Sequence, residues 1–119
     1  MLDLTAIEQL DRVIHERGRL AIMSLLAASD SLSFRELKEL LNMTDGNLSV
    51  HMRTLEEAGY VLVHKSFVNR KPRTSFSLTD AGREAFRGYI QSLEAIVRQS
   101  QPAGVGAPAV ASGLSLQTS

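Results

Sequence analysis

The segment from Thr44 to Val61 constrains the fold more than any other part of the chain. Its apolar residues recur at the spacing of one helix face: Leu48, Met52 and Leu55. Thr44 stands at an N-cap position, and Gly59 stands where the helix must end before an apolar run that is typical of a strand. The spacing therefore predicts a helix over residues 45–58 with a narrow buried face.

The outer face of this helix carries short polar side chains and one cation, with a single apolar residue among them: Asn47, Ser49, Val50, His51, Arg53 and Thr54. Such a face fits the major groove of DNA, where Asn suits adenine and Arg suits guanine. Gly46 either lets a DNA strand approach closely or is a tolerated surface glycine. His51 either contacts DNA or forms a hydrogen bond at the edge of the core. For the helix as a whole, the alternative is an ordinary amphipathic surface helix.

The residues before this helix predict three more helices. Ser33 and Glu36 have capping-box spacing and open a helix over 33–41. Only two residues separate that helix from Thr44, so the pair must turn sharply, as in a helix-turn-helix. An apolar segment predicts a central core helix over 19–28, after a loosening of the chain at Gly18. Another capping-box spacing, at Thr5 and Glu8, predicts a helix over 5–16.

Beyond Gly59 the apolar pattern changes to period two and predicts a β-hairpin over 60–78. We expect its turn over 68–73, where Pro72 has no N–H to give to the ladder. The chain has 13 basic and 13 acidic residues, and so no net charge, but the basic residues cluster at this tip. Residues 65–73 include no acid and four cations: Lys65, Arg70, Lys71 and Arg73. A neutral chain with one basic edge can bind a polyanion there.

Thr79 is the expected N-cap of a last helix over 79–98 with a long apolar stripe. We expect the helices over 5–16 and 79–98 to form a homodimer interface; the alternative is packing within one chain. The expected interface residues are Ile7, Leu10, Ile14, Phe86, Tyr89, Ile90, Leu93 and Val97. The composition after Ser100, rich in Pro, Gly, Ala and Ser, predicts a flexible tail over 99–119 behind one domain over 1–98.

Several classes of protein are disfavoured by what the sequence lacks. It has no Cys and three widely separated His, so we expect no disulfide, metal site or cofactor. It has no phosphate-binding loop and no nucleophile motif, so we do not expect an enzyme. No apolar run approaches the roughly 20 residues that span a bilayer, so we expect no membrane partner and a cytoplasmic location.

Three segments, Arg19–Leu26, Asn47–Val61 and Arg70–Arg83, resemble the MarR/ArsR-like transcriptional regulators of bacteria and archaea, above all the short winged-helix members without a sensor domain. The likeness covers about residues 5–98. It implies a mainly α protein with a small β-hairpin (α+β), a winged helix-turn-helix with N- and C-terminal dimerisation helices. It also implies a homodimer that places two recognition helices in successive major grooves of a pseudo-palindromic operator in double-stranded DNA.

The resemblance also assigns sites by position. The groove-facing residues would be Thr44, Asn47, Ser49, His51 and Arg53, and the wing-tip residues Asn69, Arg70, Lys71 and Arg73. ArsR metal sensors use Cys, so metal sensing is not carried over. A small-molecule effector could lie at the dimer interface, or that region could be packed core alone. Because the net charge is zero, a winged-helix protein-interaction module without DNA binding remains the alternative function.

Overall fold

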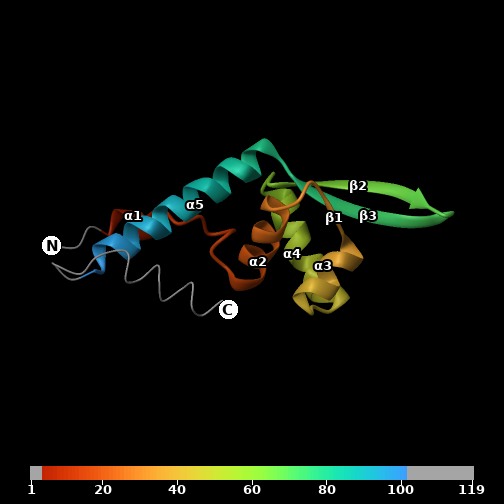
Figure 1. Ribbon diagram of the computed structural model, residues 1–119, viewed down its shortest axis with the longest axis horizontal. Helices are drawn as coiled ribbons and strands as arrows, with labels where there is room; N and C mark the ends of the chain where they lie inside the picture. Colours follow the sequence, from red (N-terminus) through yellow and green to blue (C-terminus); the bar gives the residue numbers. More distant parts are fainter. Residues whose placement is uncertain (1–3, 102–119) are drawn as a thin grey trace.

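The computed structural model describes residues 4–101, which form an elongated molecule (Figure 1). The elements in chain order are α1 (Thr5–Glu8), α2 (Arg17–Ala27), β1 (Leu32–Ser33), α3 (Phe34–Leu41), α4 (Asp45–Glu57), β2 (Val61–Val68), β3 (Lys71–Leu78) and α5 (Asp80–Gln99). The β2–β3 hairpin projects at one end of the molecule. The second half of α5 projects at the other end, with α1 beside it.

The core lies where α2, α3 and α4 meet the base of the hairpin. Its buried apolar residues are Ile14, Ile22, Met23, Leu26, Leu37, Leu48, Met52, Leu55, Val61, Phe76, Leu78 and Tyr89. The central position expected for α2 and the buried face expected for α4 are both confirmed. In the described part of the chain, no helix is both long enough and apolar enough to cross a membrane.

Side-chain caps fix the ends of the helix-turn-helix. Ser33 and Glu36 form the expected capping box, and Asn42 ends α3 in the left-handed conformation with φ 53°. Thr44 accepts a hydrogen bond from the Asn47 N–H and begins α4. Gly59 ends α4 with φ 81°, a conformation that favours glycine. The sharp turn between α3 and α4 is therefore confirmed.

The hairpin pairs β2 with β3 antiparallel, and β1 adds a third strand on the other side of β3. The sequence did not predict β1, because two residues carry no periodic signal. The predicted turn over 68–73 is too wide. The chain reverses through Asn69 and Arg70 alone, with φ 53° and 67°. Two left-handed residues form the tight turn that matches the twist of a hairpin, so residues 71–73 stay in β3.

The predicted first helix over 5–16 is wrong beyond Glu8, where α1 ends. Leu4 is its N-cap and no side chain caps it, so the expected Thr5 cap is also wrong. The cause lies at Asp11, whose carboxylate accepts the N–H groups of Val13 and Ile14 at 2.8 and 3.0 Å. This local bonding competes with helix formation.

Helix α2 begins at Arg17, two residues before the predicted start, with Glu16 as its N-cap. Gly18 is therefore part of the helix and does not loosen the chain before it. At the other end of the chain, α5 follows its Thr79 cap to Gln99, one residue past the predicted end. Most of the predicted tail, residues 102–119, lies outside the described residues.

Helix α5 begins directly against the end of α4. The Thr79 N–H donates to the Tyr60 carbonyl at 3.0 Å, and its hydroxyl donates to the Gly59 carbonyl at 2.6 Å. A Cβ added at Gly82, one turn into α5, would lie 2.2 Å from the Tyr60 carbonyl oxygen. Only glycine allows the two backbones to approach this closely.

The predicted dimer interface needs a correction. Ile14 and Tyr89 are buried in the core of a single chain, and Leu10, Phe86 and Leu93 pack partly buried against that core. Ile14 and Tyr89 therefore follow the alternative of packing within the chain, whereas for the three partly buried residues the interface stays a prediction. The exposed members of the predicted set are Ile7, Ile90 and Val97.

Candidate nucleic-acid interface

The face of α4 turned away from the core is open to solvent. It comprises Thr44, Asp45, Gly46, Asn47, Ser49, Val50 and Arg53, all exposed. Four of the five predicted groove-facing residues lie here, together with Gly46. A Cβ at Gly46 would meet nothing within 4 Å, so the surface beside it is open.

The positive end of α4 has free hydrogen-bonding capacity. The Thr44 hydroxyl oxygen accepts the Asn47 N–H at 3.2 Å and keeps its own proton to donate. The Asp45 carboxylate is turned sideways, towards α3, where Lys38 Nζ lies 2.7 Å from its Oδ1. The helix dipole and the first N–H groups can therefore attract a phosphate at this end.

His51 differs from its neighbours on α4. Its ring Nδ1 lies 3.4 Å from an Arg19 guanidinium nitrogen and 3.7 Å from Glu16 Oε1, and its side chain is only 20% exposed. A Cβ at Gly18 would lie 2.7 Å from the ring Nε2, so Gly18 makes room for it. Of the two alternatives for His51, hydrogen bonding at the edge of the core describes the structure.

The segment before α2 contacts α4 near its middle and just past its end. Near the middle of α4, Glu16 lies beside His51 while its carboxylate accepts the Arg19 N–H at 2.8 Å. That backbone hydrogen bond is the main cause that lowers the pKa of Glu16. Just past the end of α4, the Tyr60 hydroxyl donates to the Asp11 carboxylate. Burial, followed by the contact with Asp11, raises the pKa of Tyr60 to about 12. These contacts fix the orientation of the exposed α4 face.

A hollow of 610 Å³ separates α4 from the hairpin. Ser49 and Arg53 line one wall, and Lys65 and Thr74 line the other. The structure thus brings two of the predicted groove-facing residues to the same hollow as the strand residue Lys65. The sequence placed Lys65 in a basic cluster but did not show that it faces α4. The structure shows it, because Lys65 pairs with Thr74 and both residues line the hollow beside α4.

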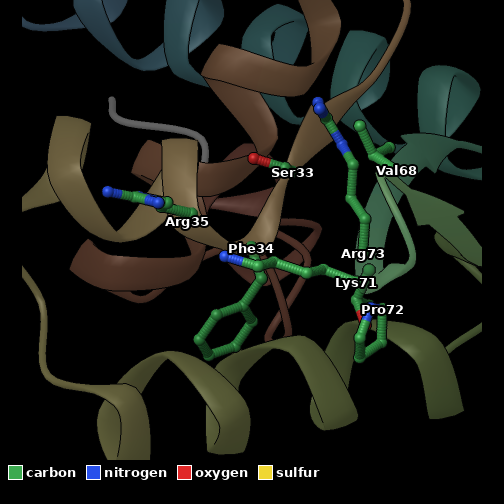
Figure 2. A pocket seen from close by; sticks show the side chains of 8 residues that line it. Ser33, Phe34, Arg35, Val68, Lys71, Pro72 and Arg73 are labelled. Carbon is green, nitrogen blue, oxygen red and sulfur yellow. The ribbon is translucent and has the colours of Figure 1, made fainter.

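The wing-tip residues Asn69, Arg70 and Lys71 are exposed, as is Arg73, but Arg73 turns towards α3. Its guanidinium lies 3.4 Å from Glu36 Oε1. The pKa of Glu36 is lowered first by the Ser33 N–H, then by the Ser33 hydroxyl, with a smaller effect of Arg73. A hollow of 430 Å³ lies between α3 and the hairpin. Figure 2 shows Lys71 and Arg73 on its hairpin side with Ser33 and Phe34 opposite, while Arg35 extends away from the hairpin. Arg35 instead pairs with Glu39 of α3 at 3.1 Å.

Within residues 4–101, no group of three or more His, Asp or Glu is arranged to hold a metal ion. The charged side chains of the interface are instead dispersed over α3, α4 and the hairpin tip. This arrangement suits an extended polyanion better than a small ligand or a metal ion.

Residues 19–97 match the family described as winged helix DNA-binding domain. The chain is similar to uncharacterized protein MJ0432 of Methanocaldococcus jannaschii, with 41% identity over 82 residues, or 69% of this chain and 89% of that protein. Among solved structures it is similar to a transcriptional regulator homologue from Pyrococcus horikoshii OT3, with 30% identity, TM-score 0.74 and coverage of 79% and 95%. It shares the fold of Sco3205, a MarR family regulator from Streptomyces coelicolor solved in complex with DNA, with 21% identity, TM-score 0.58 and coverage of 87% and 84%.

Proposed function

This chain belongs to the family of winged helix DNA-binding domains, and we propose that it regulates transcription as a homodimer bound to a two-fold operator. The family is one of DNA-binding proteins and not of enzymes, and the solved structures that share the fold include MarR- and ArsR-family regulators. The proposed function implies that the protein is located with the chromosome. The observation that carries the proposal is that the polar face of α4 and the cationic hairpin border one open hollow.

In this proposal α4 enters the major groove. Asn47, Ser49 and Arg53 are exposed on the side of α4 that faces away from the core, so they can reach base edges. A bidentate contact of Asn with adenine or of Arg with guanine contributes about 1–3 kcal/mol of discrimination. Thr44 and the first N–H groups of α4 bind a phosphate and fix the register.

The hairpin tip binds the DNA backbone or the minor groove. Asn69, Arg70 and Lys71 are exposed there. The cations contribute affinity for any sequence, because each phosphate that they neutralise releases counterions. Arg73 would have to leave Glu36 to take part, so we assign the larger contribution to Arg70 and Lys71.

A second copy of the chain would cover the apolar residues left exposed on α1 and α5. Ile7, Ile90 and Val97 are the exposed members of the predicted interface, and Leu4 joins them just before α1. Both helices project from the core on the side away from the hairpin tip (Figure 1). A dimer through this end leaves both copies of α4 free, about one helical turn of DNA or 34 Å apart.

DNA binding is tested with single charge reversals and both random and selected duplexes at several salt concentrations. We expect Arg70→Glu to weaken binding to every duplex about tenfold or more and to reduce the salt dependence. The control Arg87→Glu reverses an exposed charge on α5, paired with Glu84, and should change little. Asn47→Ala should mainly relax sequence preference. Equal losses on all sequences for Asn47→Ala and Arg70→Glu would contradict the separate roles.

Dimer formation is tested by sedimentation. We expect Ile90→Glu with Val97→Glu to give a monomer, since both exposed side chains lie on one face of α5, seven residues apart. A wild-type monomer at all concentrations would contradict the proposed homodimer. Failure of the wild type to bind any duplex at low salt would favour the alternative of a protein-interaction module.

A further inference from the structure

Phe67 is a large aromatic side chain exposed near the far end of the hairpin. It is 76% exposed, more than any other exposed large hydrophobic residue in the described part of the chain. Its ladder partner is Pro72, which is also exposed. This side chain is not part of the core, because the packed part of this hairpin face ends at Val63 and Phe76. A single exposed apolar side chain is common on protein surfaces. Phe67 is distinguished by the exposed proline opposite it in the ladder and by the basic residues around both.

Phe67 lies on the hairpin face that looks towards α4. Residues opposite each other in an antiparallel pair share a face, and every second pair returns to it. The pairs on this face are Val63 with Phe76, Lys65 with Thr74, and Phe67 with Pro72. The first two pairs line the hollow whose other wall carries Ser49 and Arg53. Phe67 extends the same wall outward, beyond Lys65, by about 7 Å.

The charges around Phe67 indicate the chemistry of the partner that it contacts. Residues 65–73 contain four basic residues and no acidic one, and Lys65, Arg70 and Lys71 are exposed. An apolar protein partner would not need this cationic frame. The minor groove of DNA offers both parts of the complement, since phosphates line its edges and sugars and bases form its interior.

The reach of the hairpin fits that groove. Val63 lines the hollow beside α4, and Phe67 lies four residues farther along β2. Four residues correspond to about 13 Å along the strand. Half of a DNA turn, about 17 Å, separates the centre of a major groove from the centre of the adjacent minor groove. The strand therefore carries Phe67 about 13 Å and the turn after Val68 about 20 Å from Val63, so the groove next to the one that α4 occupies lies within reach of this part of the hairpin.

We propose that Phe67, supported by Pro72, inserts into the minor groove beside the recognised major groove and partly unstacks one base step there. The inference rests on the proposed DNA-binding function and adds an apolar contact to its electrostatic ones. Pyrimidine–purine steps unstack most easily, so the protein should prefer TA or CA/TG at this position. The preference would arise without any hydrogen bond to a base.

The test compares Phe67→Ala with Val68→Ala. Val68 is the next residue, is also exposed, and pairs with Lys71, so strand alternation puts it on the other face of the hairpin. The probes are duplexes selected by the wild type from random DNA, with 2-aminopurine placed at successive adenines outside the recognised major groove. We expect the wild type to raise the fluorescence at one step. Phe67→Ala should abolish that rise and weaken affinity about tenfold.

Two further comparisons distinguish the loss of an inserted side chain from the loss of a phosphate contact and from a general disturbance of the hairpin. Phe67→Ala should leave the salt dependence unchanged, because no phosphate contact is lost. Phe67→Leu should retain most of the affinity, and Val68→Ala should retain both the affinity and the fluorescence rise.

Three results would overturn the inference while the wild type still binds DNA. Phe67→Ala could bind with wild-type affinity and fluorescence, or Val68→Ala could lose as much as Phe67→Ala, or Phe67→Ala could instead change the sedimentation of the free protein. If the wild type binds no duplex at all, the proposed function itself fails, so the two failures are distinguishable.

Discussion

The base and the tip of the β2–β3 hairpin are continuous in the ladder but differ in their surroundings. At the base, Val61 pairs with Leu78 and both are buried. At the tip, Phe67 pairs with Pro72 and both are exposed. The base thus contributes to the core, whereas the tip holds side chains that the core does not need. In the proposed function, folding and DNA recognition are therefore separated along one pair of strands.

The largest difference in stability between base and tip is expected when each of the two hairpin phenylalanines is truncated. Phe76 and Phe67 lie on the same face, but Phe76 is 4% exposed and Phe67 is 76% exposed. We expect Phe76→Ala to lower the free energy of unfolding by about 3–5 kcal/mol, the cost of a large core cavity. Phe67→Ala should change it by less than about 0.5 kcal/mol.

Urea unfolding at one fixed protein concentration measures both values, since dimer formation would make stability depend on concentration. Similar losses for the two variants would show that the tip is part of the folding unit after all.

The next effect is expected at Gly82, where α5 meets the hairpin base. An added Cβ would lie 2.2 Å from the Tyr60 carbonyl oxygen, and a backbone atom cannot move aside easily. We expect Gly82→Ala to lower the free energy of unfolding by about 2–3 kcal/mol.

Gly88 is the matched control in the same helix, because a Cβ there meets nothing within 4 Å. Gly88→Ala should stabilise the protein by up to about 1 kcal/mol through helix propensity. Thermal melts of the two variants should therefore shift in opposite directions.

A smaller effect, visible at high pH, is expected at Tyr60. In the folded protein the pKa of Tyr60 is raised to about 12, while the unfolded chain keeps the ordinary value of 10.0. The stabilising contribution is therefore complete below pH 10 and is lost as the pH rises towards 12, because the unfolded state ionises first. Denaturant titrations between pH 9 and 12 should show this loss.

Tyr60→Phe should flatten the pH dependence in this window, at a cost of about 1 kcal/mol at neutral pH for the lost hydrogen bond to Asp11. Burial also raises the pKa of Tyr89, the other tyrosine, so Tyr89→Phe serves as the control that keeps the Tyr60 contribution. An equally steep alkaline loss in the Tyr60→Phe variant would contradict the assignment.

The smallest effect on stability is expected at the tip. Arg70 has φ 67°, a left-handed conformation that costs a non-glycine residue free energy. We expect Arg70→Gly to raise the free energy of unfolding by about 0.5–1 kcal/mol while weakening DNA binding.

Arg70→Ala is the matched control, because it removes the same charge but keeps the strain. It should weaken DNA binding as much as Arg70→Gly without the gain in stability. If Arg70→Gly were no more stable than Arg70→Ala, the left-handed backbone at residue 70 would not be a source of strain.

The sequence predicted those parts of the fold that local chemistry determines. The Ser33–Glu36 capping box, the Thr44 and Thr79 caps and the glycine at residue 59 each define a helix end by bonds within a few residues, and all were confirmed. The buried faces of α2 and α4 followed from apolar spacing alone.

Other parts depend on contacts between distant residues, and there the sequence was insufficient. The Asp11 carboxylate that accepts the N–H groups of Val13 and Ile14 also binds Tyr60, 49 residues away, a contact that no local pattern predicts. The strand β1 exists only through its pairing with β3. His51 has the helical position of a groove residue, but its ring lies against α2, in the space beside Gly18 and in contact with Arg19. The sequence therefore predicted which residues of α4 are exposed better than it predicted orientations set by tertiary contacts.

The backbone contact between Tyr60 and Thr79 has a consequence for the spacing of DNA half-sites. Because one main-chain hydrogen bond, from Thr79 to Tyr60, and one bond from the Thr79 hydroxyl to the Gly59 carbonyl join the end of α4 to the start of α5, the angle between these helices depends on few side chains. A 20-residue helix is about 30 Å long, so a tilt of about 10° at this joint would displace its far end by about 5 Å. In the proposed dimer, the operator length that fits both subunits is thus determined at a rigid corner that never touches DNA.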